Sequence, residues 1–151
     1  ESRAWLASLS QGPRDAGGFH ISHGCPIDED EYLLTPGDAD EAFSSSAFGV
    51  CFFGHTHLPA AFELSEGNNP RLFWLHGEVS VTLREEARYL INPGSIGQPR
   101  DSDPRAAYAI LDSVKRELSI RRVAYDAESA CRRIIEAGLP ESLGRRLAMG
   151  V

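Results

Sequence analysis

The chain has few cysteines and no long apolar run. Its three cysteines, Cys25, Cys51 and Cys131, are odd in number and form no C-x-x-C pair. This excludes a disulfide framework and predicts a reduced, cytoplasmic protein. No apolar run approaches the length of a membrane span, and no signal peptide opens the chain, so we expect no membrane association.

Positive charge is also scarce. The net charge is −7, whereas a protein that binds nucleic acid without regard to sequence needs a cationic face to displace counterions from phosphate. We therefore expect no non-specific nucleic-acid binding. Residues 28–41 carry seven acidic residues and no base, and we interpret this run as a solvated surface. The remaining composition, 42% hydrophobic and 25% charged over 151 residues, is typical of one globular domain.

Strands dominate the predicted secondary structure, and the helices lie mainly near the ends. Hydrophobic periodicity and turn residues predict strands at 18–22, 48–53, 60–64, 72–75, 79–83, 88–91, 107–112 and 118–125. The strands at 72–75 and 79–83 look like a hairpin around His76 and Gly77. Helices are predicted at 2–9, 38–45 and 127–137, where Asp126 is a candidate cap, and a second C-terminal helix is predicted to begin at Pro140.

Three histidines follow the ends of predicted strands. The sequence G-H-T-H-L-P at 54–59 comes directly after the strand at 48–53, and His23 ends the strand at 18–22. In an extended backbone, His55 and His57 leave the same face, so both imidazoles can reach one small volume. Neutral imidazole is the commonest metal ligand in proteins. A simpler interpretation is that His55 and His57 are solvated loop residues. The other two histidines, His20 and His76, are not included in the predicted site.

These three imidazoles are compatible with two kinds of metal site. They can hold one zinc ion with an open fourth position. They can also form part of a two-metal centre of the kind used in phosphate chemistry, which needs carboxylates and above all a bridging one. The acidic residues at 28–31 lie close to His23 in the sequence, but their density indicates solvent rather than a site.

Motifs along nearly the whole chain resemble those of the calcineurin-like metallophosphoesterases, in particular the small bacterial branch. They are H-G-x-P at 23–26, G-H-T-H at 54–57 and N-P-G-S-I-G-Q-P-R-D at 92–101. The C-terminal part of the chain carries further motifs that resemble the family: A-Y-A-I-L-D at 107–112, R-V-A-Y-D at 122–126 and A-G-L-P at 137–140. G-H-T-H alone is a modest signal, but together with N-P-G-S-I-G-Q-P-R it is strong.

The resemblance implies a fold, an activity and a ligand set. The fold class is α/β: a four-layer α/β/β/α sandwich, of which this chain would form mostly the C-terminal sheet and terminal helices. The activity is hydrolysis of phosphomonoesters or phosphodiesters with two divalent metals (Mn, Fe, Ni or Zn). By this resemblance His23 and His55 bind one metal and His57 binds the other. Asn92 to Ser95 form a supporting loop. Arg100 either meets substrate phosphate or pairs at the surface with an adjacent aspartate.

The chain departs from the family in its N-terminal motifs. D-x-H, G-D-x-x-D and G-N-H-[DE] supply the remaining ligands, the bridging Asp and the catalytic histidine that acts as general acid, and none of them is present. The segments at 37–41 and 67–69 imitate two of these motifs without their key residues. We therefore expect residues 1–151 to be a single but N-terminally incomplete domain. It would pair with a complementary segment or chain across an open sheet edge and an uncovered apolar face.

Three functions remain open from the sequence. The first is a metallophosphoesterase, whose substrate is a phosphorylated small molecule, a nucleotide or a phosphoprotein. The second is a non-catalytic protein-binding scaffold of the same fold. The third is a mononuclear zinc-binding domain built from His23, His55 and His57.

Overall fold

A computed structural model describes residues 2–151 and contains two β-sheets and four α-helices. The helices are α1 (Ser2–Ala7), α2 (Pro36–Ser45), α3 (Ala127–Glu136) and α4 (Glu141–Met149). The strands are β1 (Arg14–Asp15), β2 (His20–Ile21), β3 (Val50–Phe52), β4 (Ala60–Ser65), β5 (Arg71–Trp74), β6 (Val79–Thr82), β7 (Ala87–Asn92), β8 (Ala106–Asp112) and β9 (Glu117–Val123).

The larger sheet has the strand order β1-β2-β3-β7-β4-β5. Its centre is parallel, because β2 pairs with β3 and β3 pairs with β7 in the same direction. The flanking pairs are antiparallel. The parallel strands β2, β3 and β7 all end at one edge of the sheet, and the segments that follow them therefore meet there.

The smaller sheet has the order β6-β9-β8 and is antiparallel. The predicted strand pair at 107–112 and 118–125 is confirmed as β8 and β9. The predicted hairpin around His76 and Gly77 is wrong. β5 is an edge strand of the larger sheet beside β4, whereas β6 pairs with β9 in the smaller sheet. The chain thus crosses between sheets at His76 and Gly77, and local turn composition cannot distinguish this crossing from a hairpin.

Two hydrophobic cores define three layers. One core packs α2 against one face of the larger sheet, through Phe43, Cys51 and Leu90. The other lies between the two sheets and contains Ile91 of the larger sheet and Ile120 of the smaller sheet. Leu90 and Ile91 are neighbours in β7 that point to opposite faces, as the period of a strand requires. The predicted α/β class is confirmed, with the layers α2, larger sheet and smaller sheet.

The boundaries of α2 are set by polar contacts at both ends. Thr35 caps its first turn, and the side chain of Asp38 completes a capping box. At the other end, the guanidinium of Arg88 from β7 donates to the carbonyl oxygens of Phe43, Ser46 and Phe48. The helix predicted at 38–45 therefore begins two residues earlier than expected, at Pro36.

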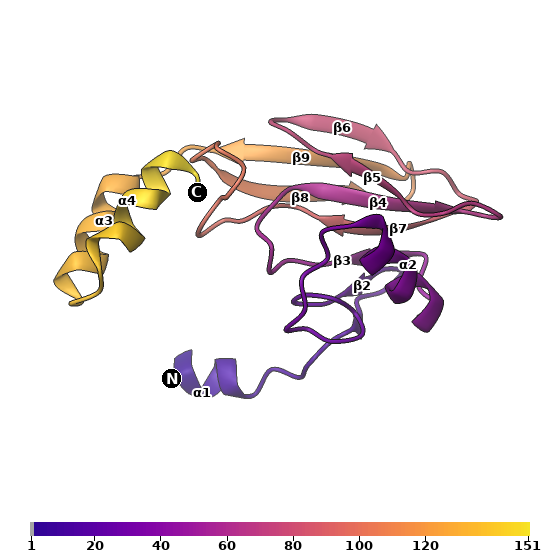
Figure 1. The fold of residues 1–151 in the computed structure, drawn as a ribbon, viewed down its shortest axis with the longest axis horizontal. Coiled ribbons are helices and arrows are strands. Elements are labelled where there is room, and N and C mark those ends of the chain that lie inside the picture. The colour runs from indigo at the N-terminus through magenta and orange to yellow at the C-terminus, as the bar shows by residue number, and fades with distance from the viewer. Residues whose placement is uncertain (1) are drawn as a thin grey trace.

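The terminal helices contribute little to either core. α3 and α4 lie side by side beyond the end of β9, and α1 stands apart from the sheets (Figure 1). Trp5, Leu6 and Leu9 in and after α1 are all exposed. Asp126 caps α3 through the backbone N–H of Ser129, as predicted. None of the helices within residues 2–151 combines the length and apolarity that crossing a bilayer requires.

Candidate functional site

Two of the predicted ligands, His23 and His55, are in contact. Each follows a strand of the parallel pair β2–β3, and the two segments stay paired beyond the strands because the Gly54 N–H donates to the His23 carbonyl oxygen at 2.7 Å. His55 Nδ1 lies 3.0 Å from His23 Nε2, and the ring centroids are 4.8 Å apart. Parallel pairing therefore brings together imidazoles that are 32 positions apart in the sequence.

His55 and His57 do not lie in an extended backbone. Their φ angles are 63° and 61°, in the left-handed region, and the Thr56 N–H donates to the Gly54 carbonyl oxygen at 2.7 Å. The expectation that both side chains leave one face of a strand is wrong, because the residues form a tight turn. His57 instead contacts the loop after β7, where its Nδ1 lies 2.9 Å from the carbonyl oxygen of Gln98.

Asn92 supports this turn from the end of β7. Its side chain is fully buried, and its Nδ2 donates to the Gly54 carbonyl oxygen at 2.9 Å and to Thr56 Oγ1 at 2.8 Å. Its Oδ1 accepts from the Gly94 N–H at 2.8 Å. One amide therefore connects the histidine turn with the loop that follows β7. A residue in the left-handed region costs free energy, so such a turn needs surrounding contacts of this kind.

Ser95 organises the loop that reaches His57. Its Oγ accepts from the N–H groups of Gly97 and Gln98, at 3.3 and 2.9 Å. Its carbonyl oxygen accepts from the Ala107 N–H at 2.8 Å, which ties the loop to β8. The contact between Ser95 and Gln98 fixes the segment whose carbonyl group faces the His57 ring.

Burial lowers the pKa of His57, and the positive charge of Arg100 lowers it further. His55 and His23 act in the same direction, while the hydrogen bond to Gln98 opposes them. His57 is therefore favoured in its neutral form, the form with a free lone pair. Arg100 lies close enough to His57 to affect its charge. The alternative surface pairs for Arg100 are wrong, because Asp101 and Asp103 pair with Arg122 and Arg105.

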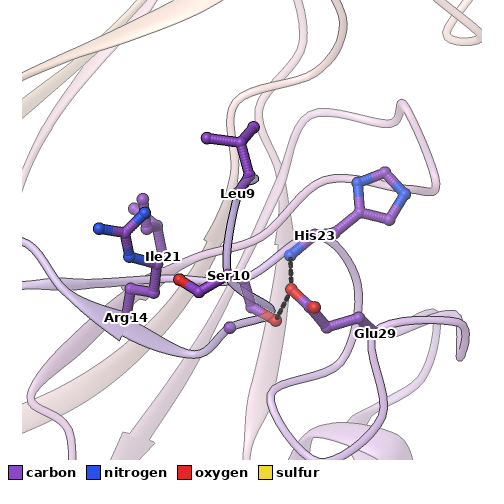
Figure 2. Close-up of a pocket in the computed structure, with 8 residues that line it drawn as sticks. Leu9, Ser10, Arg14, Ile21, His23 and Glu29 are labelled. Atoms are coloured by element: carbon purple, nitrogen blue, oxygen red, sulfur yellow. Dashed lines mark hydrogen bonds between the residues drawn. The ribbon is translucent and has the colours of Figure 1, made fainter. Parts of the chain in front are cut away.

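Two residues of the acidic segment after His23 contact the histidine pair, although the sequence indicated only a solvated surface. Tyr32 stacks on His55, with ring centroids 4.3 Å apart and an interplanar angle of 19°. Glu29 Oε1 accepts from the His23 backbone N–H at 2.8 Å (Figure 2). Proximity to His23 in the sequence was the only available signal, since charge density alone does not distinguish a contact from a solvated face.

A cavity of about 320 Å³ lies behind the main chain of His23. Arg14, Ile21 and Glu29 are among the residues that line it. Figure 2 shows that the His23 imidazole points away from Arg14 and Ile21, so the cavity and the contact with His55 lie on different sides of the His23 backbone.

The donor atoms fit part of a divalent-metal site. Two imidazole nitrogens that bind one ion at about 2.1 Å stand about 3.0 to 3.4 Å apart for bond angles between a right angle and the tetrahedral angle. The nitrogens of His23 and His55 are 3.0 Å apart, which is also the distance of a hydrogen bond between the two rings. Within residues 2–151, however, no group of three or more His, Cys, Asp and Glu side chains is close enough to hold a metal ion. His57 is therefore near the pair without joining it, and the described residues supply an incomplete ligand set.

The structure resembles two solved structures, one of which is a metallophosphoesterase. A metallophosphoesterase from Sphaerobacter thermophilus superposes with a TM-score of 0.86 and 35% identity, covering 98% of this chain and 62% of that one. The hypothetical protein PH1004 from Pyrococcus horikoshii has a TM-score of 0.69 at 17% identity, over 99% of this chain and 54% of that one, which shows the fold alone. The chain has the calcineurin-like metallophosphoesterase fold, as its motifs predicted.

A curated relative also matches this chain over only part of its own length. The uncharacterized protein MJ0912 from Methanocaldococcus jannaschii is 42% identical over 120 residues, which are 80% of this chain and 46% of that protein. No family model matches the chain. The chain thus spans about half the length of this relative and less than two thirds of the two solved structures.

Proposed function

We propose that the chain supplies the histidine side of a two-metal centre that hydrolyses phosphomonoesters or phosphodiesters. The contact between His23 and His55, at the edge where the parallel strands end, carries this proposal. In it, His23 and His55 hold one ion and His57 holds the other. The fold of the Sphaerobacter thermophilus metallophosphoesterase supports the reaction class.

The structure indicates how His57 would act as a ligand. A carbonyl oxygen can only accept a hydrogen bond, so the contact with Gln98 requires the proton to sit on His57 Nδ1. The lone pair is then on Nε2, which is free to bind an ion, and the Gln98 carbonyl fixes the ring orientation. The lowered pKa of His57 favours the form in which this nitrogen is unprotonated.

The bound ions would activate water and neutralise charge on the phosphoryl oxygens. The chain's own contribution would be the three imidazoles, with the charge of Arg100 acting on His57. We assign Arg100, whose charge acts on His57, to the substrate phosphate as a donor of two parallel hydrogen bonds. The substrate is then a phosphorylated small molecule, a nucleotide or a phosphoprotein, and Mn, Fe, Ni or Zn suits imidazole together with carboxylate.

The carboxylate ligands and the general acid remain to be supplied. Since residues 2–151 gather no third ligand around His23 and His55, we assign these groups to a complementary segment or chain. The exposed apolar residues of α1, including Trp5 and Leu6, are consistent with a surface that such a segment covers. The three free cysteines support a reducing, cytoplasmic setting.

Metal content and turnover in matched histidine variants test the proposal. In the longest natural form of the protein, we expect two ions per chain and hydrolysis of bis(p-nitrophenyl) phosphate. His57→Ala should lose one ion and at least about 100-fold in turnover, because even residues that only orient a ligand change activity 10- to 100-fold. His76→Ala is the matched control, because His76 is exposed and lies in the crossing between the sheets.

The other outcomes select the remaining functions. One ion per chain without turnover would overturn the two-metal proposal in favour of a mononuclear zinc domain. No bound metal, with partner binding unaffected by His57→Ala, would favour the protein-binding scaffold.

A further inference from the structure

The segment at 26–34 folds back against the ends of β2 and β3. The Cys25 N–H donates to the carbonyl oxygen of Glu31 at 3.1 Å, and Leu33 is buried in the core beside α2. Gly24 permits this return, because a Cβ at that position would lie 2.3 Å from the carbonyl oxygen of Glu29. The segment is therefore held at both its start and its end, although most of its side chains are exposed.

Glu29 reaches from this segment to the main chain of His23. Its Oε1 accepts from the His23 N–H at 2.8 Å and lies 3.4 Å from Ser22 Oγ. A hydrogen bond from a backbone N–H to a carboxylate is charge-assisted and stronger than a neutral one. The carboxylate therefore fixes the residue that carries the first imidazole of the pair (Figure 2).

Tyr32 reaches from the same segment to the ring of His55. The two rings are stacked, and the His23 ring meets His55 edge-on with an interplanar angle of 62°. The His55 imidazole is thus bounded by Tyr32 on its face and by His23 beside it. Since stacked contacts restrict rotation of a side chain, Tyr32 limits the planes that the His55 ring can adopt.

We propose that Glu29 and Tyr32 are positioning residues of the metal centre, Glu29 for the main chain of His23 and Tyr32 for the ring plane of His55. The inference rests on the proposed function, in which His23 and His55 bind the same ion. Both contacts then keep the two imidazole nitrogens at a separation suited to that ion. One segment contacts both members of the pair, whereas Asp28 accepts hydrogen bonds from its near neighbours in the same segment, the N–H groups of Asp30 and Glu31.

Cobalt(II) binding to the longest natural form of the protein tests this inference without relying on turnover. Tyr32→Ala and Glu29→Ala should each weaken cobalt affinity about 10- to 100-fold and change the visible absorption of the bound ion. Tyr32→Phe keeps the stack and Glu29→Gln keeps an acceptor oxygen, so both should stay within about threefold of the native affinity. Asp30→Ala, an exposed change in the same segment, is the matched control and should have no effect.

Failure of the positioning role and failure of the proposed function give different results. Equal losses in Tyr32→Phe and Tyr32→Ala, or native cobalt affinity in both alanine variants, would overturn the positioning role. If the native protein binds no cobalt, the proposed function fails, and nuclear Overhauser contacts between the His23 and His55 rings then decide. Contacts that are lost in Tyr32→Ala but kept in Tyr32→Phe would support positioning, and contacts kept in both variants would refute it.

Discussion

A buried ion pair behind the candidate site provides the sharpest test of how this fold is stabilised. Arg122 of β9 pairs with Asp101, and their side chains are 0% and 5% exposed. Arg122 Nη1 also donates to the Arg105 carbonyl oxygen at 3.2 Å. Asp101 lies within the loop between β7 and β8 that also carries Gln98, so the pair fixes this loop to β9 of the smaller sheet. We predict that Asp101→Asn destabilises the protein strongly.

The expected magnitude follows from burial. Removing one partner of a buried pair costs about 3–5 kcal/mol, because the other charge is left in a dry environment. Asp103 lies 3.8 Å from Arg122 Nε and retains part of the attraction, so we expect the lower end, about 3 kcal/mol. For a chain of this size, that corresponds to a fall in Tm of about 6–12 °C.

Urea unfolding followed by far-ultraviolet circular dichroism measures this change. Fluorescence is less suitable, because both tryptophans, Trp5 and Trp74, are exposed. Glu141→Gln breaks an exposed pair with Arg145 and serves as the control, with an expected loss below about 0.5 kcal/mol. A loss in Asp101→Asn no larger than in this control would refute the reasoning.

A second variant separates charge from packing. Arg122→Met combined with Asp101→Asn leaves no buried charge of the pair, so the double variant should lose at least about 1 kcal/mol less than Asp101→Asn alone. A double variant that is less stable than Asp101→Asn would show that the aliphatic packing of Arg122 matters more than its charge.

Two further predictions concern stability. Arg88→Ala should destabilise the protein by about 2–4 kcal/mol in urea unfolding, because three carbonyl acceptors near the end of α2 lose their donor. A loss below about 1 kcal/mol would show that water replaces the guanidinium. The hydrogen bond from Arg105 lowers the pKa of Asp103 from 3.8 to about 2. The resulting stabilisation, about 2 kcal/mol, is present above the pKa of the unfolded chain and is lost as the pH falls from about 4 to 2. Asp103→Asn should therefore flatten the pH dependence of the free energy of unfolding in that window, and an unchanged slope would contradict the assignment.

The sequence predicted those parts of the fold in which local pattern and tertiary pairing agree. The strands at 106–112 and 117–123 pair with each other in antiparallel register across a short polar turn, and Asp126 has a local capping contact. The crossing at His76 and Gly77 could not be predicted, because β5 already pairs with the preceding strand β4, and the partner of β6, which is β9, lies far away in the chain.

The candidate site was predictable in composition but not in geometry. The order of the motifs along the chain identified His23, His55 and His57 as candidate ligands. Parallel pairing of β2 and β3 then brings His23 against His55. The left-handed turn at His55 and His57 depends on a buried amide from a different strand, which no local pattern encodes. The contacts of Glu29 and Tyr32 depend on how an acidic segment returns to the sheet, and its composition indicated only solvent.

The dependence of the histidine turn on Asn92 affects how such turns should be sought in other sequences. G-H-T-H occurs by chance, and as an isolated peptide it has no reason to hold two left-handed histidines on either side of a buried threonine. A search that also requires an asparagine at the end of a later strand, followed by Pro-Gly-Ser, selects for the partner that makes the turn stable. The same requirement applies to grafting, since a transplanted turn needs its neighbouring strand.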